Sequence, residues 1–228
     1  MSGSILKLIA CIAMLFDHIA GYMPAGVLGL DDTILMLGGE ALDLRHIMHS
    51  IGRIAFPIFA FLITEGFEHT RDRKRYGLNL LLFAVISEIP WNLVHCSGLF
   101  FHKQNVFFTL FLGYLGLCAI EYFKDNKRYM GGSILLLFLV ALILKADYQI
   151  LGFGFIIFIY LMKHQKALMA ILGCCLLPSR IVGGMAFIPI LMYNGERGFA
   201  KAKWTKYAFY IFYPLHLLVI FLIRTYIL

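Results

Sequence analysis

The segment from Lys7 to Met23, KLIACIAMLFDHIAGYM, decides the fold, because it is apolar enough to cross a bilayer as a helix. A hydrocarbon core of about 30 Å needs about 20 mostly apolar residues per helix. The same segment carries Asp17 and His18. An Asp at the centre of a membrane helix costs roughly 2.5 to 3.5 kcal/mol, so such side chains should face the interior of a helix bundle.

Composition extends this interpretation to the whole chain. Of the 228 residues, 61% are hydrophobic and only 14% are charged, which leaves too little polar surface for a soluble domain. The N-terminal stretch shows no convincing small-x-small cleavage motif, so it is expected to be a span rather than a signal peptide. We therefore expect residues 1–228 to form one all-α domain, a polytopic transmembrane helix bundle.

The apolar stretches predict eight or nine spans. They lie near residues 5–24, 46–67, 76–95, 105–123, 129–146, 150–162, 167–192 and 207–227. Pro178 and the pair Gly183-Gly184 interrupt the stretch 167–192, which either crosses once or splits into two short helices. Lys and Arg gather in the loops that are cytoplasmic if the N-terminus is inside, so a cytoplasmic N-terminus is predicted.

Cysteine spacing and net charge exclude several classes of site. The five cysteines contain no CxxC pair and indicate neither a disulfide framework nor a zinc site. No metal is therefore expected. The formal charge of +7 comes from basic loop residues, which orient membrane proteins, so it does not indicate nucleic-acid binding.

Helix geometry places five ionisable side chains from four predicted spans in one layer. At about 1.5 Å per residue, Asp17 and His18 lie about 18 and 20 Å from the inner boundary, and Arg53 lies about 10 Å from the outer one. Glu88 and His216 lie about 18 and 14 Å from the inner ends of their spans. The layer predicts a polar site. Asp17 and His18 point about 100° apart, so they should meet partners on different spans.

Each member of this layer also has a structural interpretation. His18 could be an interhelical histidine with satisfied hydrogen bonds, and Arg53 could neutralise a buried carboxylate. Glu88 could hold a bent helix together. His216 could satisfy a carbonyl that is freed by the ring of Pro214.

A buried histidine, a carboxylate, an arginine and basic inner loops together suit acyl transfer. A histidine can take a proton from an amine or hydroxyl, or carry the acyl group itself, while a carboxylate orients it. An arginine can hold an oxyanion or an anionic substrate, and a basic rim can meet the phosphates of coenzyme A. A proton-coupled small-solute transporter would use many of the same residues. A polar layer that only locks helices together is the third interpretation.

Several stretches of the sequence together resemble one known family. They are LKLIACIAMLFDHIA, IGRIAFPIFAFLITEGFEHTRDRKRY, NLLLFAVISEIPWNL, YNGERG and YAFYIFYPLHLLVI, in this order over most of the chain. They resemble the TraX family, named after the F-pilin N-acetyltransferase. The resemblance implies a membrane-embedded acetyltransferase that uses acetyl-coenzyme A, similar in outline to the transmembrane acyltransferases that include the lysosomal heparan glucosaminide N-acetyltransferase. A histidine in an early span is central there, and the resemblance implies that His18 is the corresponding position.

The resemblance and the polar layer together predict the site. His18 is expected to act as base or acyl carrier, Arg53 to stabilise the oxyanion, and Asp17 or Glu88 to orient the imidazole, with His216 as a further catalytic candidate. The residues expected to bind acetyl-coenzyme A are Arg71, Arg73, Lys74, Arg75, Arg197, Tyr193 and Asn194.

The resemblance leaves the acceptor open. A pilin peptide, a cell-envelope glycan and a small amine or alcohol all remain as alternatives. The expected location is the bacterial cytoplasmic membrane, with the lipid bilayer as the surrounding partner.

Overall fold

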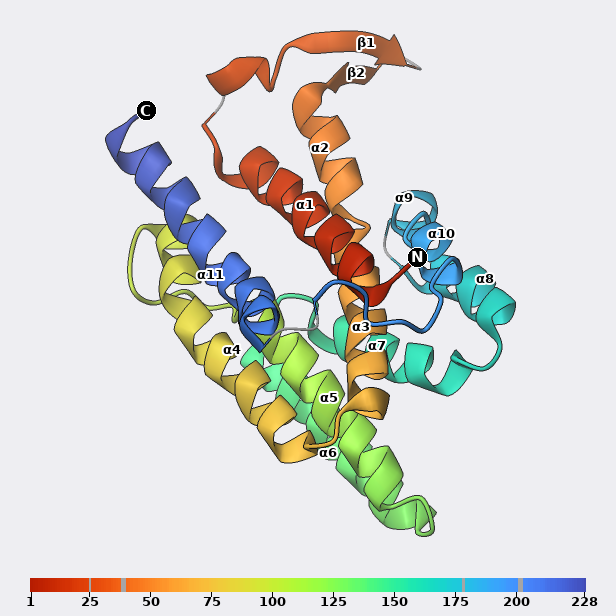
Figure 1. Cartoon of the computed structure of the whole chain (residues 1–228). Coiled ribbons are helices and arrows are strands. Elements are labelled where there is room, and N and C mark those ends of the chain that lie inside the picture. The colour runs from red at the N-terminus through yellow and green to blue at the C-terminus, as the bar shows by residue number, and fades with distance from the viewer. Residues whose placement is uncertain (25, 38–39, 178, 201–202) are drawn as a thin grey trace.

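The computed structural model describes residues 1–24, 26–37, 40–177, 179–200 and 203–228 (Figure 1). In chain order the elements are α1 (Gly3–Tyr22), η1 (Val27–Gly29), β1 (Thr33–Leu37), β2 (Glu40–Asp43), α2 (Leu44–Gly52), α3 (Ala55–His69), α4 (Arg73–Cys96), α5 (Val106–Tyr122), α6 (Lys127–Leu144), α7 (Gln149–Met162), α8 (Lys166–Leu176), α9 (Arg180–Gly184), α10 (Phe187–Leu191) and α11 (Lys203–Tyr226).

Long apolar helices confirm that the chain is a helical membrane protein. Among the residues that the structure describes, five stretches are long and apolar enough to cross a bilayer: α1, the joined α2 and α3, α4, α6, and residues 207–226 of α11. Four further apolar stretches are shorter, at 106–122, 149–162, 166–176 and 181–191. A count of eight or nine spans therefore requires several of these shorter helices to cross as well.

One β-hairpin adds to the all-α architecture. Strands β1 and β2 pair antiparallel, with Leu35 opposite Leu42, in a region that the hydropathy pattern assigns to a loop between spans. The hairpin leads directly into α2, where the Asp43 carboxylate accepts a hydrogen bond of 2.8 Å from the backbone N–H of His46. Figure 1 shows the hairpin at one end of the molecule, beyond the helices.

The second predicted span is broken into α2 and α3. The break falls at Arg53 and Ile54, one turn before Pro57, which lies in the first turn of α3. Proline has no N–H to donate to the carbonyl of Arg53, so a continuous helix would lose a hydrogen bond there. The break places Arg53 at a bend within the span.

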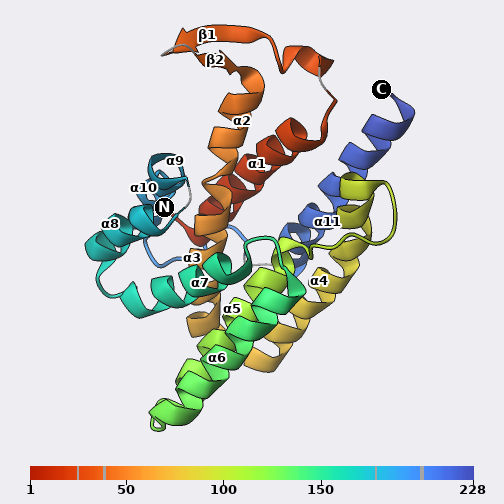
Figure 2. The same cartoon turned by 180° about the vertical axis from the view of Figure 1, so that it is seen from behind.

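The ambiguous stretch 167–192 forms three helices, one more than the split form of the prediction. Helices α8, α9 and α10 lie together beside α3 (Figure 2). A Cβ added at Gly173 of α8 would overlap the ring of Phe187 in α10, so these two helices approach very closely. The stretch therefore folds back on itself. Pro178, one of the predicted interruptions, lies outside the described residues.

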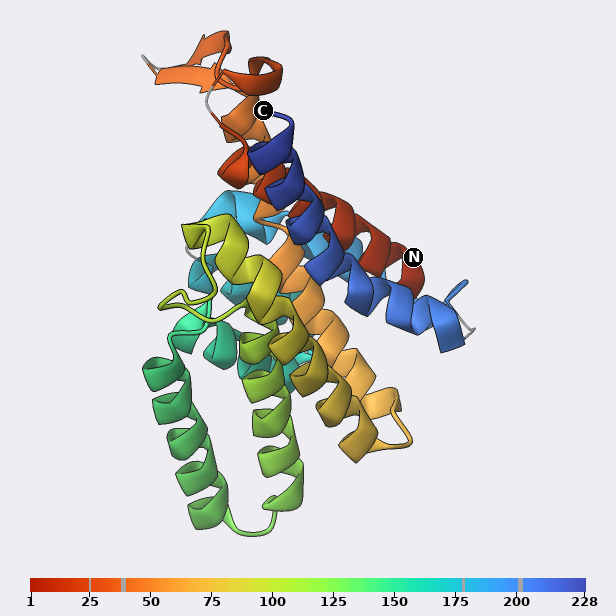
Figure 3. The same ribbon diagram turned by 90° about the vertical axis from the view of Figure 1, so that its left-hand side faces the viewer.

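The interior is built around α3, α5 and α7, whereas α6 is peripheral. Gly113 of α5 lies against Ile156 of α7, which is fully buried. Only 6% of the apolar segment of α6 is buried inside the protein, against 56% of the corresponding segment of α4. Figure 3 shows α6 on the outer side of α5, with the turn between them extending beyond the other helices. A helix that buries so little inside the protein presents its apolar surface to lipid.

The start of the chain is fixed to the segment that precedes α11. The backbone N–H of Gly3 donates to the carbonyl of Glu196 at 2.8 Å, and that of Asn194 donates to the carbonyl of Met1 at 3.0 Å. The Ser4 hydroxyl donates to the carbonyl of Arg197 at 2.6 Å. These bonds hold the beginning of α1 beside the beginning of α11.

Replacement of Gly113 with Ala should destabilise the protein, because the new methyl group overlaps Ile156. Overpacking typically costs about 1 to 3 kcal/mol. The matched control is Gly131→Ala on α6, where an added Cβ meets nothing within 4 Å and the helix gains up to about 1 kcal/mol from propensity. Thermal unfolding in detergent should give a lower midpoint for Gly113→Ala than for Gly131→Ala. Equal midpoints would contradict the described contact between α5 and α7.

Candidate functional site

Two predicted catalytic residues from opposite ends of the chain lie in direct contact. His18 of α1 and His216 of α11 have their Nδ1 and Nε2 atoms, respectively, 2.6 Å apart. Their rings are nearly parallel, with an interplanar angle of 5° and centroids 4.9 Å apart. His216 is almost completely buried, whereas His18 is half-buried. The pair therefore has one enclosed member and one accessible member.

Hydrogen bonding fixes which nitrogen of each neutral ring carries the proton. The Nδ1 atom of His216 lies 2.7 Å from the carbonyl oxygen of Phe212. A carbonyl can only accept, so this Nδ1 must carry hydrogen and the Nε2 of His216 must accept. The donor to it is the Nδ1–H of His18. The Nε2 of His18 is consequently left with a free lone pair, as a general base requires.

Aromatic rings and a third histidine surround His18. The rings of Tyr22 and Tyr213 lie 5.5 and 6.0 Å from it, centroid to centroid. The hydroxyl of Tyr22 lies 3.1 Å from Nε2 of His95, and Nδ1 of His95 lies 2.9 Å from the carbonyl of Trp91. The same reasoning makes the Tyr22 hydroxyl the donor to His95. His95 was not predicted from the sequence, because a histidine near the end of a span is an ordinary residue at a membrane interface.

Asp17 meets a partner on a different helix from the partner of His18, as predicted. Its carboxylate lies 2.8 Å from Nδ1 of His49 on α2, and its side chain occupies the space above Gly52, where any Cβ would overlap it. Asp17 thus joins α1 to α2, while His18 joins α1 to α11. The hydrogen-bond partner of His18 Nδ1 is His216, so the position expected for Asp17 or Glu88 beside the imidazole is taken by another residue.

Glu88 has a different set of partners. Its carboxylate accepts hydrogen bonds from the backbone N–H of Asn105, at 3.0 Å, and from the side-chain amide of the same residue. Asn105 also caps α5 by accepting from the N–H of Phe107. Glu88 therefore joins α4 to the beginning of α5, and the structure does not bring it to the histidine pair.

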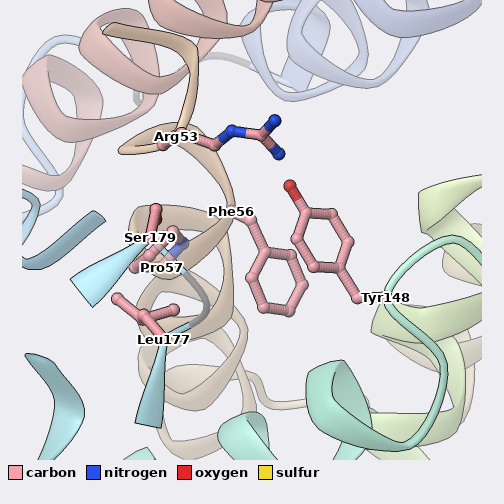
Figure 4. Close-up of a pocket in the computed structure, with 6 residues that line it drawn as sticks. All are labelled: Arg53, Phe56, Pro57, Tyr148, Leu177 and Ser179. Atoms are coloured by element: carbon pink, nitrogen blue, oxygen red, sulfur yellow. The ribbon is translucent and has the colours of Figure 1, made fainter. Parts of the chain in front are cut away.

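Arg53 faces a pocket of about 270 Å³ that Phe56, Pro57, Tyr148, Leu177 and Ser179 also line. Figure 4 shows the Tyr148 hydroxyl pointing toward the guanidinium, and the Tyr148 ring stacks on Phe56 with centroids 3.8 Å apart. Within the part of the chain that the structure describes, the guanidinium makes no hydrogen bond or ion pair.

Asp147 is a second residue that was not predicted from the sequence. It lies in the short connection between α6 and α7, and its side chain is exposed. Desolvation by the surrounding protein, followed by the charge of Asp17, raises the pKa of Asp147 to about 6. An aspartate between two predicted spans usually marks an ordinary loop, so the sequence carried no signal for this placement.

The residues predicted to bind acetyl-coenzyme A divide into two groups. Tyr193 and Asn194 line a second pocket of about 290 Å³, together with Phe61, Glu65, Lys163, Lys166 and Gly195.

The other predicted donor-site residues do not line this pocket. Arg71, Arg73, Lys74 and Arg75 lie at the turn between α3 and α4, and they are exposed. The guanidinium of Arg73 covers the ring of Phe67 at 4.3 Å. Arg197 is exposed, and its carbonyl binds Ser4. Among the described residues, no group of three or more His, Cys, Asp or Glu side chains could hold a metal ion.

Comparison with known proteins agrees with the motifs over the whole chain. A protein of Dichelobacter nodosus, described as "Probable fimbrial assembly protein FimC, serogroup H1", is 29% identical over 93% of this chain and 91% of its own length. An uncharacterized protein of Rickettsia prowazekii (strain Madrid E) is 26% identical over 75% of this chain and 59% of its own. No solved structure matches. The family described as TraX protein matches residues 2–224, and the chain therefore belongs to the TraX family.

Proposed function

We propose that the protein is a membrane-embedded acetyltransferase that moves an acetyl group from cytoplasmic acetyl-coenzyme A to an amine or hydroxyl acceptor. The observation that carries this proposal is the proton-free Nε2 of His18, which follows from the chain of contacts His18, His216 and Phe212. Membership of the TraX family supports it. The half-buried His18 remains accessible to a substrate, whereas His216 is enclosed.

The proposed reaction begins when Nε2 of His18 takes a proton from the acceptor. The acceptor nitrogen or oxygen attacks the thioester carbonyl, and a new bond to the acetyl carbon forms as the bond to sulfur breaks. The imidazolium then returns the proton to the thiolate of coenzyme A. The bond from His18 Nδ1–H to His216 can persist through both protonation states, because this nitrogen keeps its hydrogen throughout. Transient acetylation of the same Nε2 is the alternative route.

Three other predicted catalytic residues have more distant roles in this proposal. Asp17 positions α1 through His49, and Glu88 positions the beginning of α5 through Asn105. The role of Arg53 in oxyanion stabilisation stays a prediction. Its guanidinium faces the pocket beside Tyr148.

The donor is proposed to bind at the pocket lined by Lys163, Lys166, Tyr193 and Asn194. Two ammonium groups and an amide suit the phosphates of coenzyme A. Lys163 also forms an ion pair with Glu68, so the exposed Lys166 is the better candidate for phosphate contact. The exposed residues Arg71 to Arg75, and Arg197, are proposed to attract the anionic donor from outside the pocket.

The proposed orientation follows from the location of the donor. With a cytoplasmic N-terminus and eight or nine spans in the bacterial cytoplasmic membrane, the turns that contain Arg71 and Lys163 both face the cytoplasm. The acceptor then approaches from the other side. The name of the Dichelobacter nodosus relative, a probable fimbrial assembly protein, supports a pilin peptide as acceptor. A glycan or small molecule of the cell envelope has the same reactive groups.

Replacement of His18 with Ala should remove the acyl-transfer activity while acetyl-coenzyme A still binds. Loss of a general base typically lowers the rate by about 10²- to 10⁴-fold. Purified protein in nanodiscs is incubated with radiolabelled acetyl-coenzyme A, and binding, release of free coenzyme A and protein-bound label are measured. His46→Ala is the control, because that side chain is 67% exposed at the start of α2. Wild-type turnover by His18→Ala would rule out the assignment. Absence of donor binding in a folded sample would instead favour a proton-coupled transporter.

Replacement of His216 should separate a positioning role from a purely structural one. In His216→Ala, the Nδ1 of His18 loses its acceptor, so the reactive tautomer is no longer favoured. An imidazole that loses its orienting partner can lose up to about 10⁴-fold in rate, as in serine proteases. His216→Gln offers an amide oxygen near the former Nε2 and should recover part of the activity. Equal loss in both variants, with unchanged donor binding and thermal stability, would contradict control of the tautomer.

Replacement of Lys166 with Gln should weaken acetyl-coenzyme A binding by roughly tenfold, the size of one charge-assisted hydrogen bond. Isothermal titration of the full-length protein in detergent measures this change. The matched control is Lys124→Gln, an exposed lysine at the turn between α5 and α6. An unchanged affinity in Lys166→Gln, combined with a loss in Arg71→Gln, would move the donor site to the turn between α3 and α4.

A further inference from the structure

The guanidinium of Arg53 is a cation within a span that has no bonded counter-charge among the described residues. It lies at the break between α2 and α3, in the span 44–69. A charged side chain in the middle of a span is costly, and such side chains normally pair or line a polar cavity. Arg53 does line a cavity, the pocket of about 270 Å³ described above.

One hydroxyl group lies beside the guanidinium. The phenol of Tyr148 points toward it (Figure 4), and Ser179 is a further lining residue whose hydroxyl lies against Gly183. Tyr148 is held in place, because its ring stacks on Phe56 and its Cβ lies directly against Gly152. A fixed phenol beside a planar guanidinium supplies donors in a preorganised arrangement.

The rest of the lining is apolar. Phe56, Pro57 and Leu177 form the remainder of the described wall. A ligand that fills this pocket therefore needs an anionic head and an apolar body. The volume is close to the lower limit for small-molecule sites, so it suits a head group with a short apolar part.

Neither of the two nearby carboxylates pairs with Arg53, so an external anion can bind there. Asp17 is hydrogen-bonded to His49 on the other side of Gly52. Asp147 affects the electrostatics of Tyr148 and is itself affected by Arg53, but it is not in ion-pair contact with Arg53 and does not line the pocket. A bound anion must therefore gain more from the guanidinium and the Tyr148 hydroxyl than it loses by repulsion from Asp147.

We propose that the pocket between α3, the connection of α6 to α7, and the connection of α8 to α9 binds the phosphate group of an amphiphilic molecule. The forked guanidinium of Arg53 and the hydroxyl of Tyr148 face the phosphate, and Phe56, Pro57 and Leu177 face the apolar part. A phosphate is favoured over a carboxylate because it presents enough acceptor oxygens for both the two-pronged guanidinium and the separate Tyr148 hydroxyl. This binding does not depend on acetyl transfer, so it is tested without acetyl-coenzyme A.

The test uses native mass spectrometry of the delipidated full-length protein in detergent. Dioctanoyl phosphatidic acid is titrated against wild type, and dioctanoylglycerol, which has the same chains without the phosphate, serves as the ligand control. Arg53→Gln should weaken phosphatidic acid binding by about tenfold or more, since it removes a charge-assisted hydrogen bond to the phosphate. Tyr148→Phe should weaken it by a smaller factor. The protein control is Arg128→Gln, which replaces an exposed arginine at the beginning of α6 and should leave phosphatidic acid binding unchanged.

Two outcomes would overturn the proposal: equal binding of phosphatidic acid by Arg53→Gln and wild type, or binding of dioctanoylglycerol as tight as that of phosphatidic acid. Arg53→Lys, which keeps the charge but loses the fork, gives an intermediate affinity and replaces Arg53→Gln if that variant does not fold.

Competition by inorganic phosphate identifies the source of the ligand. Displacement shows that a free phosphate group suffices, and its failure shows that the lipid chains are required. Both results support phosphate recognition.

Discussion

The cost of placing polar side chains in a bilayer is the constraint on which this structure depends. Helix α1 carries Asp17 and His18, and neither can face lipid without a substantial penalty. Because adjacent helical residues diverge by about 100°, satisfying both requires neighbours on two sides. His49 of α2 and His216 of α11 provide them. The same two contacts that satisfy α1 therefore determine which helices surround it.

One local device recurs in three histidines of the described chain. His69, His95 and His216 each direct Nδ1 toward the carbonyl four residues earlier, at 2.9, 2.9 and 2.7 Å. A helix carbonyl in this position accepts only, so the ring becomes an acceptor at Nε2. In His95 and His216 that acceptor is then used, by Tyr22 and His18 respectively. The backbone thereby specifies the direction of hydrogen bonds between helices without a buried charge.

The sequence predicted the features that follow from local chemistry. Apolar length located the long helices, and the angle between neighbouring residues predicted separate partners for Asp17 and His18. Motifs identified the family. These predictions depend on residues that are close together in the chain, where helix geometry is known in advance.

Features that depend on distant contacts could not be predicted in the same way. His216 belongs to the predicted polar layer, but nothing in one sequence indicates that it, rather than Asp17 or Glu88, contacts His18. Asp147 lies at a loop position where an aspartate is ordinary, and only the tertiary structure brings it near enough to Asp17 for their charges to interact. The segment 167–192 forms three short helices because Gly173 admits the ring of Phe187, a fit between surfaces that hydropathy does not record.

The separation of 198 residues between His18 and His216 has a consequence for synthesis. Helix α1 emerges from the ribosome first, and its histidine has no final partner until α11 has been inserted. During that interval the polar groups of α1 depend on α2, on water or on the insertion machinery. The tautomer of His18 is thus established only when the last helix joins the first, so an incomplete chain holds the imidazole but not the arrangement that directs its lone pair.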